Sequence, residues 1–98
     1  MIKMMQNQIE IKINLKTKRY LNGQLAVFVQ EISGEPLAEL SLMNNSVELE
    51  GDEFILKDYT ENKELVNHLI KLKVIKSINR FVLIGSHLCP ICQIASES

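Results

Sequence analysis

The chain has 98 residues, a formal net charge of -1, and 46% hydrophobic and 23% charged residues. These values are typical of one globular domain and exclude disordered, collagen-like and low-complexity chains. They also disfavour a generic nucleic-acid binder, which is normally basic. The chain has no run of 18 apolar residues, so no membrane-spanning helix is expected. We expect a single domain over 1–98, with flexible ends at 1–7 and 95–98.

The first half of the chain alternates between strand patterns and turns. Apolar and polar residues alternate over residues 8–16, and residues 25–32 are apolar on both faces, as in a central strand. Asn22-Gly23 and Gly34 mark the turns that follow these two strands. Five strands, forming an antiparallel meander, are predicted at residues 8–16, 25–32, 37–42, 47–50 and 53–57.

Helical spacing follows the meander. Leucines recur at i, i+4 and i+7, which predicts an amphipathic helix over residues 60–73. One or two C-terminal strands are expected after it, at residues 80–84 and 88–94. The predicted fold class is therefore α+β: an antiparallel β-meander with one amphipathic helix packed on one face, then the C-terminal strands.

Charge is unevenly distributed along the chain. Residues 31–64 carry a net charge of -8, whereas residues 1–30 and 65–80 each carry +4. On a strand, Glu48 and Glu50 share a face about 6.5–7 Å apart, which is close to the phosphate spacing of a nucleic-acid strand. This pattern predicts a phosphate mimic that docks into a basic channel of a partner. A solvated edge strand, protected by its charges from pairing with other strands, is the alternative. The predicted partner-binding residues are Glu48, Glu50, Asp52, Glu53 and Asp58.

Cys89-Pro90-Ile91-Cys92 forms a CxxC pair. Without a secretory signal pattern at the N-terminus, the thiols are expected to be reduced and the protein cytoplasmic. Two buried structural thiols are one interpretation. The alternatives are a redox pair and a zinc site, shared between two chains or completed by His87 or His68. No metal ligand or cofactor is assigned, and Cys89, Cys92 and His87 are the candidates if zinc is bound.

Catalytic motifs give no support for an enzyme. The sequence has no glycine-rich phosphate loop, no GxSxG and no HExxH. His68 lies mid-helix, and the sequence places no carboxylate or nucleophile to pair with it. We therefore expect a non-enzymatic protein.

Turn and core residues carry a resemblance to DUF4313, a family of small proteins without an assigned activity. At Lys73-Val74 the chain lacks the helix-ending glycine expected of that family. The segments that resemble it are Tyr20-Leu21-Asn22-Gly23-Gln24-Leu25-Ala26-Val27, Gly34-Glu35-Pro36-Leu37-Ala38-Glu39-Leu40-Ser41, Phe54-Ile55-Leu56-Lys57-Asp58-Tyr59-Thr60-Glu61-Asn62 and Gly85-Ser86-His87-Leu88-Cys89-Pro90-Ile91-Cys92.

The resemblance implies a small cytosolic protein of phages, plasmids and conjugative elements. Such genes often encode inhibitors of host defence, including anti-CRISPR proteins. The leading hypothesis is thus a binding module whose acidic surface docks on a CRISPR effector nuclease or another defence complex, with no direct contact to nucleic acid. The alternative is a structural or regulatory homodimer that uses an exposed sheet edge and is stapled by zinc through the CxxC pair.

Overall fold

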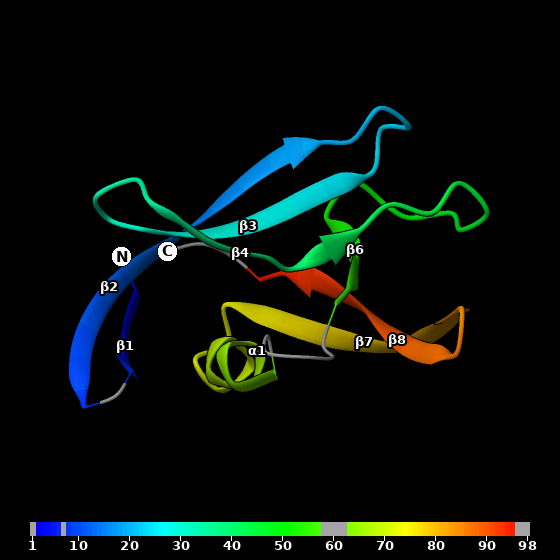
Figure 1. Ribbon diagram of the computed structural model, residues 1–98. Coiled ribbons are helices and arrows are strands. Elements are labelled where there is room, and N and C mark those ends of the chain that lie inside the picture. Colours follow the sequence, from blue (N-terminus) through cyan, green and yellow to red (C-terminus); the bar gives the residue numbers. More distant parts are fainter. Residues whose placement is uncertain (1, 7, 58–62, 96–98) are drawn as a thin grey trace.

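The computed structural model describes residues 2–6, 8–57 and 63–95, which form two four-stranded antiparallel sheets and one helix (Figure 1). The predicted α+β class is confirmed for these residues. The first sheet has the order β1-β2-β3-β4, and the second has the order β5-β6-β8-β7. The elements are β1 (Ile2–Gln6), β2 (Ile9–Arg19), β3 (Leu25–Glu31), β4 (Pro36–Glu39), β5 (Ser41–Leu42), β6 (Glu53–Leu56), α1 (Lys63–Lys71), β7 (Ile75–Ile84) and β8 (His87–Ile94).

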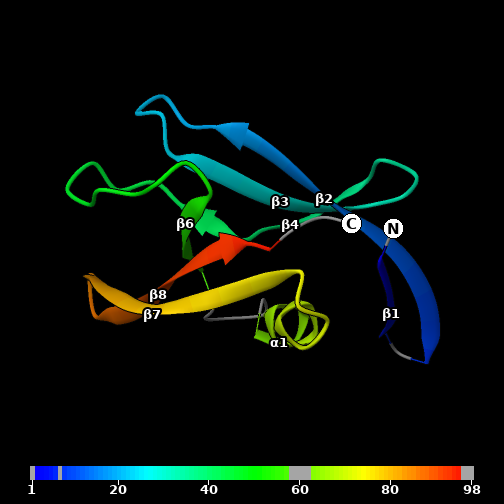
Figure 2. The same ribbon diagram turned by 180° about the vertical axis from the view of Figure 1, so that it is seen from behind.

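The main core lies between the two sheets and the helix. Figures 1 and 2 show β3 on one side and the second sheet with α1 on the other, while β1 and the start of β2 curve round to the side of α1. Both faces of β3 are largely buried, as its apolar sequence predicts. The residues buried in this core come from both sheets and the helix and include Ile13, Val27, Val29, Leu40, Phe54, Leu56, Leu69, Ile75 and Cys92.

The chain changes sheets at Leu40. The Leu40 amide donates to the Val27 carbonyl of the first sheet at 2.8 Å, and its carbonyl accepts from the Lys57 amide at 2.7 Å. The strand predicted over residues 37–42 is therefore divided into β4 and β5. For this reason the first 57 residues do not form one meander. Strands β1 to β4 follow each other in the first sheet, and β5 and β6 are neighbours in the second.

A partly buried hydroxyl network fixes this crossing. The Tyr20 hydroxyl donates to Glu39 Oε2 at 2.5 Å and lies 2.9 Å from Ser41 Oγ. Ser41 Oγ in turn accepts from the Val27 amide at 2.8 Å. Burial and the Glu39 carboxylate raise the pKa of Tyr20 to about 12. The network thus ties the turn after β2 to both ends of the crossing.

This pKa predicts a loss of stability at high pH. An unfolded tyrosine ionises near pH 10, whereas Tyr20 in the folded protein keeps its proton up to about pH 12. Between these values the unfolded state holds fewer protons, so stability falls as the pH rises. Near pH 7 we expect Tyr20→Phe to lower the free energy of unfolding by about 1–2 kcal/mol.

Urea unfolding of both proteins along a pH series measures this effect. The difference between the wild type and Tyr20→Phe is expected to narrow between about pH 10 and pH 12. The remaining ionisable groups are the same in both proteins and cancel in the comparison. A difference that stays constant across this range would contradict the assignment.

Strand β2 serves two neighbours in succession. Its first part pairs with β1, its later part pairs with β3, and Ile13 belongs to both ladders. Residues 2–6, within the segment predicted to be a flexible end, form β1. His68 Nε2 on α1 lies 2.9 Å from the Lys3 carbonyl oxygen, which ties β1 to the helix. At the other end, the Ala95 amide bonds to the Val74 carbonyl, and residues 96–98 lie outside the described part.

The helix ends in a left-handed residue that is not glycine. Lys73 has a φ of 63°, and the Val74 amide bonds to the Leu69 carbonyl at 3.0 Å. This 6→1 bond defines a Schellman cap, for which glycine is the usual residue. The helix therefore stops without the expected glycine. Residues 60–62 of the predicted helix lie outside the described residues. None of the helices described is long and apolar enough to span a membrane.

Candidate functional site: the acidic loop

The acidic loop, residues 43–52, connects β5 to β6. It crosses the face of the second sheet that is turned away from the main core. Val47 and Leu49 pack against a small core of Ile55, Cys89 and Ile91 on that face. The intervening residues, Glu48 and Glu50, are exposed, as is Asp52. Alternation of apolar and acidic residues thus anchors the loop by one side and presents carboxylates on the other.

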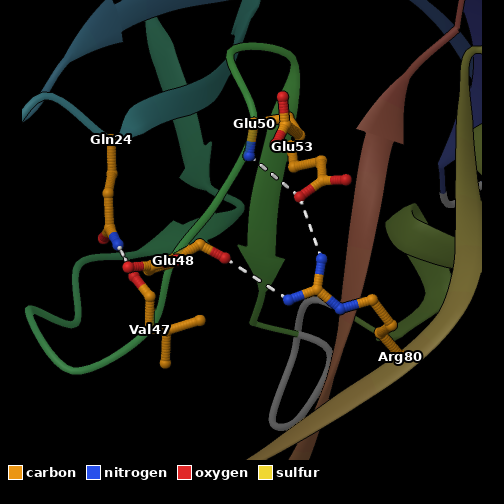
Figure 3. Close-up of polar contacts among 6 residues, drawn as sticks. All are labelled: Gln24, Val47, Glu48, Glu50, Glu53 and Arg80. Carbon is orange, nitrogen blue, oxygen red and sulfur yellow. Dashed lines mark hydrogen bonds and ion pairs between the residues drawn. The ribbon is translucent and has the colours of Figure 1, made fainter.

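Gln24 fixes the first half of this loop. Its Nε2 donates to the carbonyls of Asn44 and Val47 at 2.9 and 2.8 Å, and its Oε1 accepts from the Asn44 amide at 2.9 Å. The neighbouring Asn22 donates to Asn45 Oδ1 at 2.8 Å. The turn between β2 and β3, where Gly23 adopts a φ of 89°, therefore holds a loop about twenty residues further along the chain (Figure 3).

Arg80 and Glu53 fix the second half. Glu53 Oε1 accepts from the Glu50 amide at 3.0 Å and from Arg80 Nη1 at 3.2 Å. Arg80 Nη2 donates to the Glu48 carbonyl at 3.3 Å. Figure 3 shows the arginine reaching from β7 across β8 to the glutamate on β6. One guanidinium thereby joins an edge strand, an inner strand and the loop.

A bulge in β7 positions this arginine. The pairing with β8 shifts between Ser77 and Arg80, which leaves two extra residues on β7. One of them, Asn79, has a φ of 65°, a conformation that asparagine tolerates better than most residues. Beyond the bulge, Arg80 is paired with Ile91, whose side chain belongs to the core under the acidic loop.

Two of the sequence-based predictions for this region are wrong. Residues 47–50 form no strand, so the strand spacing that likened Glu48 and Glu50 to successive phosphates does not apply. Glu53 is only 6% exposed and binds Arg80 inside the structure, so its carboxylate does not face a partner. Asp58 lies outside the described residues. Glu48, Glu50 and Asp52 remain as exposed acids of one loop.

A groove of about 550 Å³ lies beside the loop. Arg80 and the turn at Asn22 line one part of it, and the loop supplies Glu48 and Glu50. The side chain of Arg80 is 50% exposed, so a positive group lies among the acids. The groove can therefore bind positive groups through Glu48 and Glu50 and negative groups through Arg80, and among the described residues that line it the carboxylates outnumber the one arginine.

The CxxC thiols lie on opposite faces of β8. Cys92 is buried in the main core and Cys89 in the core under the acidic loop. Residues three apart on a strand point to opposite sides, so both thiols cannot ligate one ion while β8 is intact. This geometry contradicts the zinc staple through the pair, and the interpretation as two buried thiols agrees with the structure. His87 is exposed at the start of β8. In the described part of the chain, no three histidine, cysteine or acidic residues are grouped as metal ligands.

The residues that hold the loop, Gln24, Arg80 and Glu53, are not evident as a set in the sequence. They are far apart in the chain and come together only when the bulge and the turn are in place. One signal for Glu53 is present, because it directly precedes the apolar run Phe54-Ile55-Leu56 and so begins a buried strand. Comparisons with family models, with curated proteins and with solved structures find no match to this chain.

Proposed function

We propose that the protein is a non-enzymatic binding module that docks its acidic loop on a basic surface of a partner protein. The observation that carries this proposal is that Glu48 and Glu50 are exposed on a loop fixed at both halves by Gln24, Arg80 and Glu53. A loop that is already ordered loses little conformational entropy on binding, so its charges contribute more to affinity.

Charge complementarity defines the partner. Exposed carboxylates steer association with a basic surface and fix its register. The basic surface that we propose is the nucleic-acid channel of a host defence complex, with a CRISPR effector nuclease as the specific case. Only the charge of the loop supports this docking, because Glu48 and Glu50 are not on a strand and so do not have the spacing that resembles phosphates.

The remaining side chains that could act in catalysis or metal binding have structural roles, which supports a non-enzymatic function. His68 bonds to the Lys3 carbonyl, Glu53 bonds to Arg80, and the two cysteines are in separate cores. The histidine and the glutamate thus connect elements of the fold, and the thiols are buried in its cores.

Reversal of three charges tests the proposal. The variant Glu48→Lys/Glu50→Lys/Asp52→Lys is expected to bind the effector nuclease at least about 100-fold more weakly, because like charges would then oppose the basic surface. Binding is measured by interferometry with purified effector, together with inhibition of target cleavage. Wild-type binding is expected to weaken with added salt and to be displaced by the nucleic acid that fills the channel.

A matched control carries the same change in net charge elsewhere. The variant Glu10→Lys/Glu35→Lys/Glu64→Lys alters three exposed acids outside the loop and is expected to bind and inhibit as the wild type does. If both triple variants lose binding equally, net charge and not the acidic loop is responsible. Full inhibition by the loop variant would refute the docking model.

A further inference from the structure

The hairpin of β7 and β8 extends an uncovered apolar face beyond the main core. Phe81, Leu83 and Leu88 are 54%, 66% and 62% exposed. The pairing places Leu83 opposite Leu88 and Phe81 opposite Pro90, so all three side chains lie on one face of the hairpin. We call these three residues the apolar hairpin face.

This face continues the side of the sheet that elsewhere covers the main core. Along β8, Leu88 has the same orientation as Cys92 because alternate residues share a face, and Cys92 is buried in that core. At the other end of β7, Ile75 lies in the same core with α1 residues such as Leu69. The sheet surface is thus covered at one end of the hairpin and exposed at the other. Figures 1 and 2 show the turn of this hairpin at the end away from α1.

The opposite face of the same hairpin is already occupied. Val82 and Ile84 pack against the core of Ile55, Cys89 and Ile91, which lies under the acidic loop. The acidic loop therefore covers the hairpin on the side of Val82 and Ile84, and not on the side of the apolar hairpin face. Within the described residues β7 is also the last strand of its sheet.

We propose that a second copy of this chain covers the apolar hairpin face, with the two hairpins packed face to face about a two-fold axis. Residues 81–92 contain no Asp, Glu, Lys or Arg. Two copies can therefore bring these two hairpin faces together without opposing like charges.

The exposed area fits a weak contact between two copies. The three side chains expose roughly 350 Å² per copy, in the range of patches that are commonly functional on a monomer. Two such patches bury about 700 Å² together, which is less than the roughly 1,000 Å² of a stable specific interface. This size predicts a weak dimer that dissociates on dilution. The inference concerns a different face of the molecule from the acidic loop and does not depend on the proposed function.

Sedimentation over a concentration series tests the proposal. We expect the mass of the wild type to rise from the 11.2 kDa of one chain to that of two chains. Leu83→Lys is expected to keep the single-chain mass up to at least about tenfold higher concentration, because a lysine would be buried against its own copy. At its exposed position this substitution leaves the folded monomer intact, which circular dichroism verifies.

Leu21→Lys is the matched control, since Leu21 is fully exposed in the turn after β2. This variant is expected to dimerise as the wild type does. A wild type that keeps the mass of one chain throughout, or that forms larger assemblies than two chains, would overturn the proposal. Equal dimerisation of Leu83→Lys and the wild type would place any contact elsewhere and would likewise overturn it.

Discussion

Glu53→Ala is expected to lower the free energy of unfolding by about 2–3 kcal/mol, the range for hydrogen bonds to a charged group that is buried. The substitution removes the common acceptor of the Glu50 amide and the Arg80 guanidinium. Arg80 is half exposed and can return to water, so most of the loss comes from the Glu50 amide, which loses its acceptor, and from the released loop. Urea denaturation followed by circular dichroism measures the change.

Glu48→Ala is the control for this prediction. Glu48 is exposed and offers only its backbone carbonyl to Arg80, so its truncation should change stability by no more than about 0.5 kcal/mol. The two variants lose the same charge from neighbouring parts of the chain. Equal stability of Glu53→Ala and Glu48→Ala would show that the buried carboxylate does not stabilise the fold.

Phe54→Ala is expected to have the largest effect on stability, about 3–5 kcal/mol. Phe54 is completely buried in the main core, on an inner strand beside β8. Its truncation leaves a cavity between both sheets and the helix. Because domains of this size are stable by only about 5–15 kcal/mol, the variant should unfold at a much lower urea concentration.

Phe81→Ala makes the same chemical change at a site that is 54% exposed. At low protein concentration, where the proposed dimer is dissociated, we expect a loss below about 1 kcal/mol. Comparison of the two variants separates burial from residue type. Similar midpoints for both would contradict the assignment of Phe54 to the core.

Local patterns were sufficient for most of the elements. The apolar character of β3 on both faces and the helical leucine spacing near α1 follow from the sequence, because each depends on residues that are close in the chain. The division of residues 37–42 at Leu40 could not be predicted, since both β4 and β5 have strand patterns. Which sheet each joins depends on the partners Val27 and Lys57.

The candidate site shows the same limit. The sequence identifies the acids but cannot distinguish Glu53, which is buried, from Glu48, which is exposed. That distinction depends on Arg80, 27 residues away, and on the bulge that turns this arginine toward the loop. Val47 and Leu49, which alternate with these glutamates, pack against the small core, although the segment has no strand partner.

Because Cys89 and Cys92 lie on opposite faces of β8, their thiols can report on two different opening motions of the fold. A thiol must reach solvent as thiolate to react, so each cysteine is exposed by a different fluctuation. Lifting of the acidic loop uncovers the core around Cys89, whereas Cys92 requires the two sheets to part. Local opening of a loop takes less free energy than global unfolding. Cys89 should therefore be modified first, at a rate set by the same loop that we propose for docking.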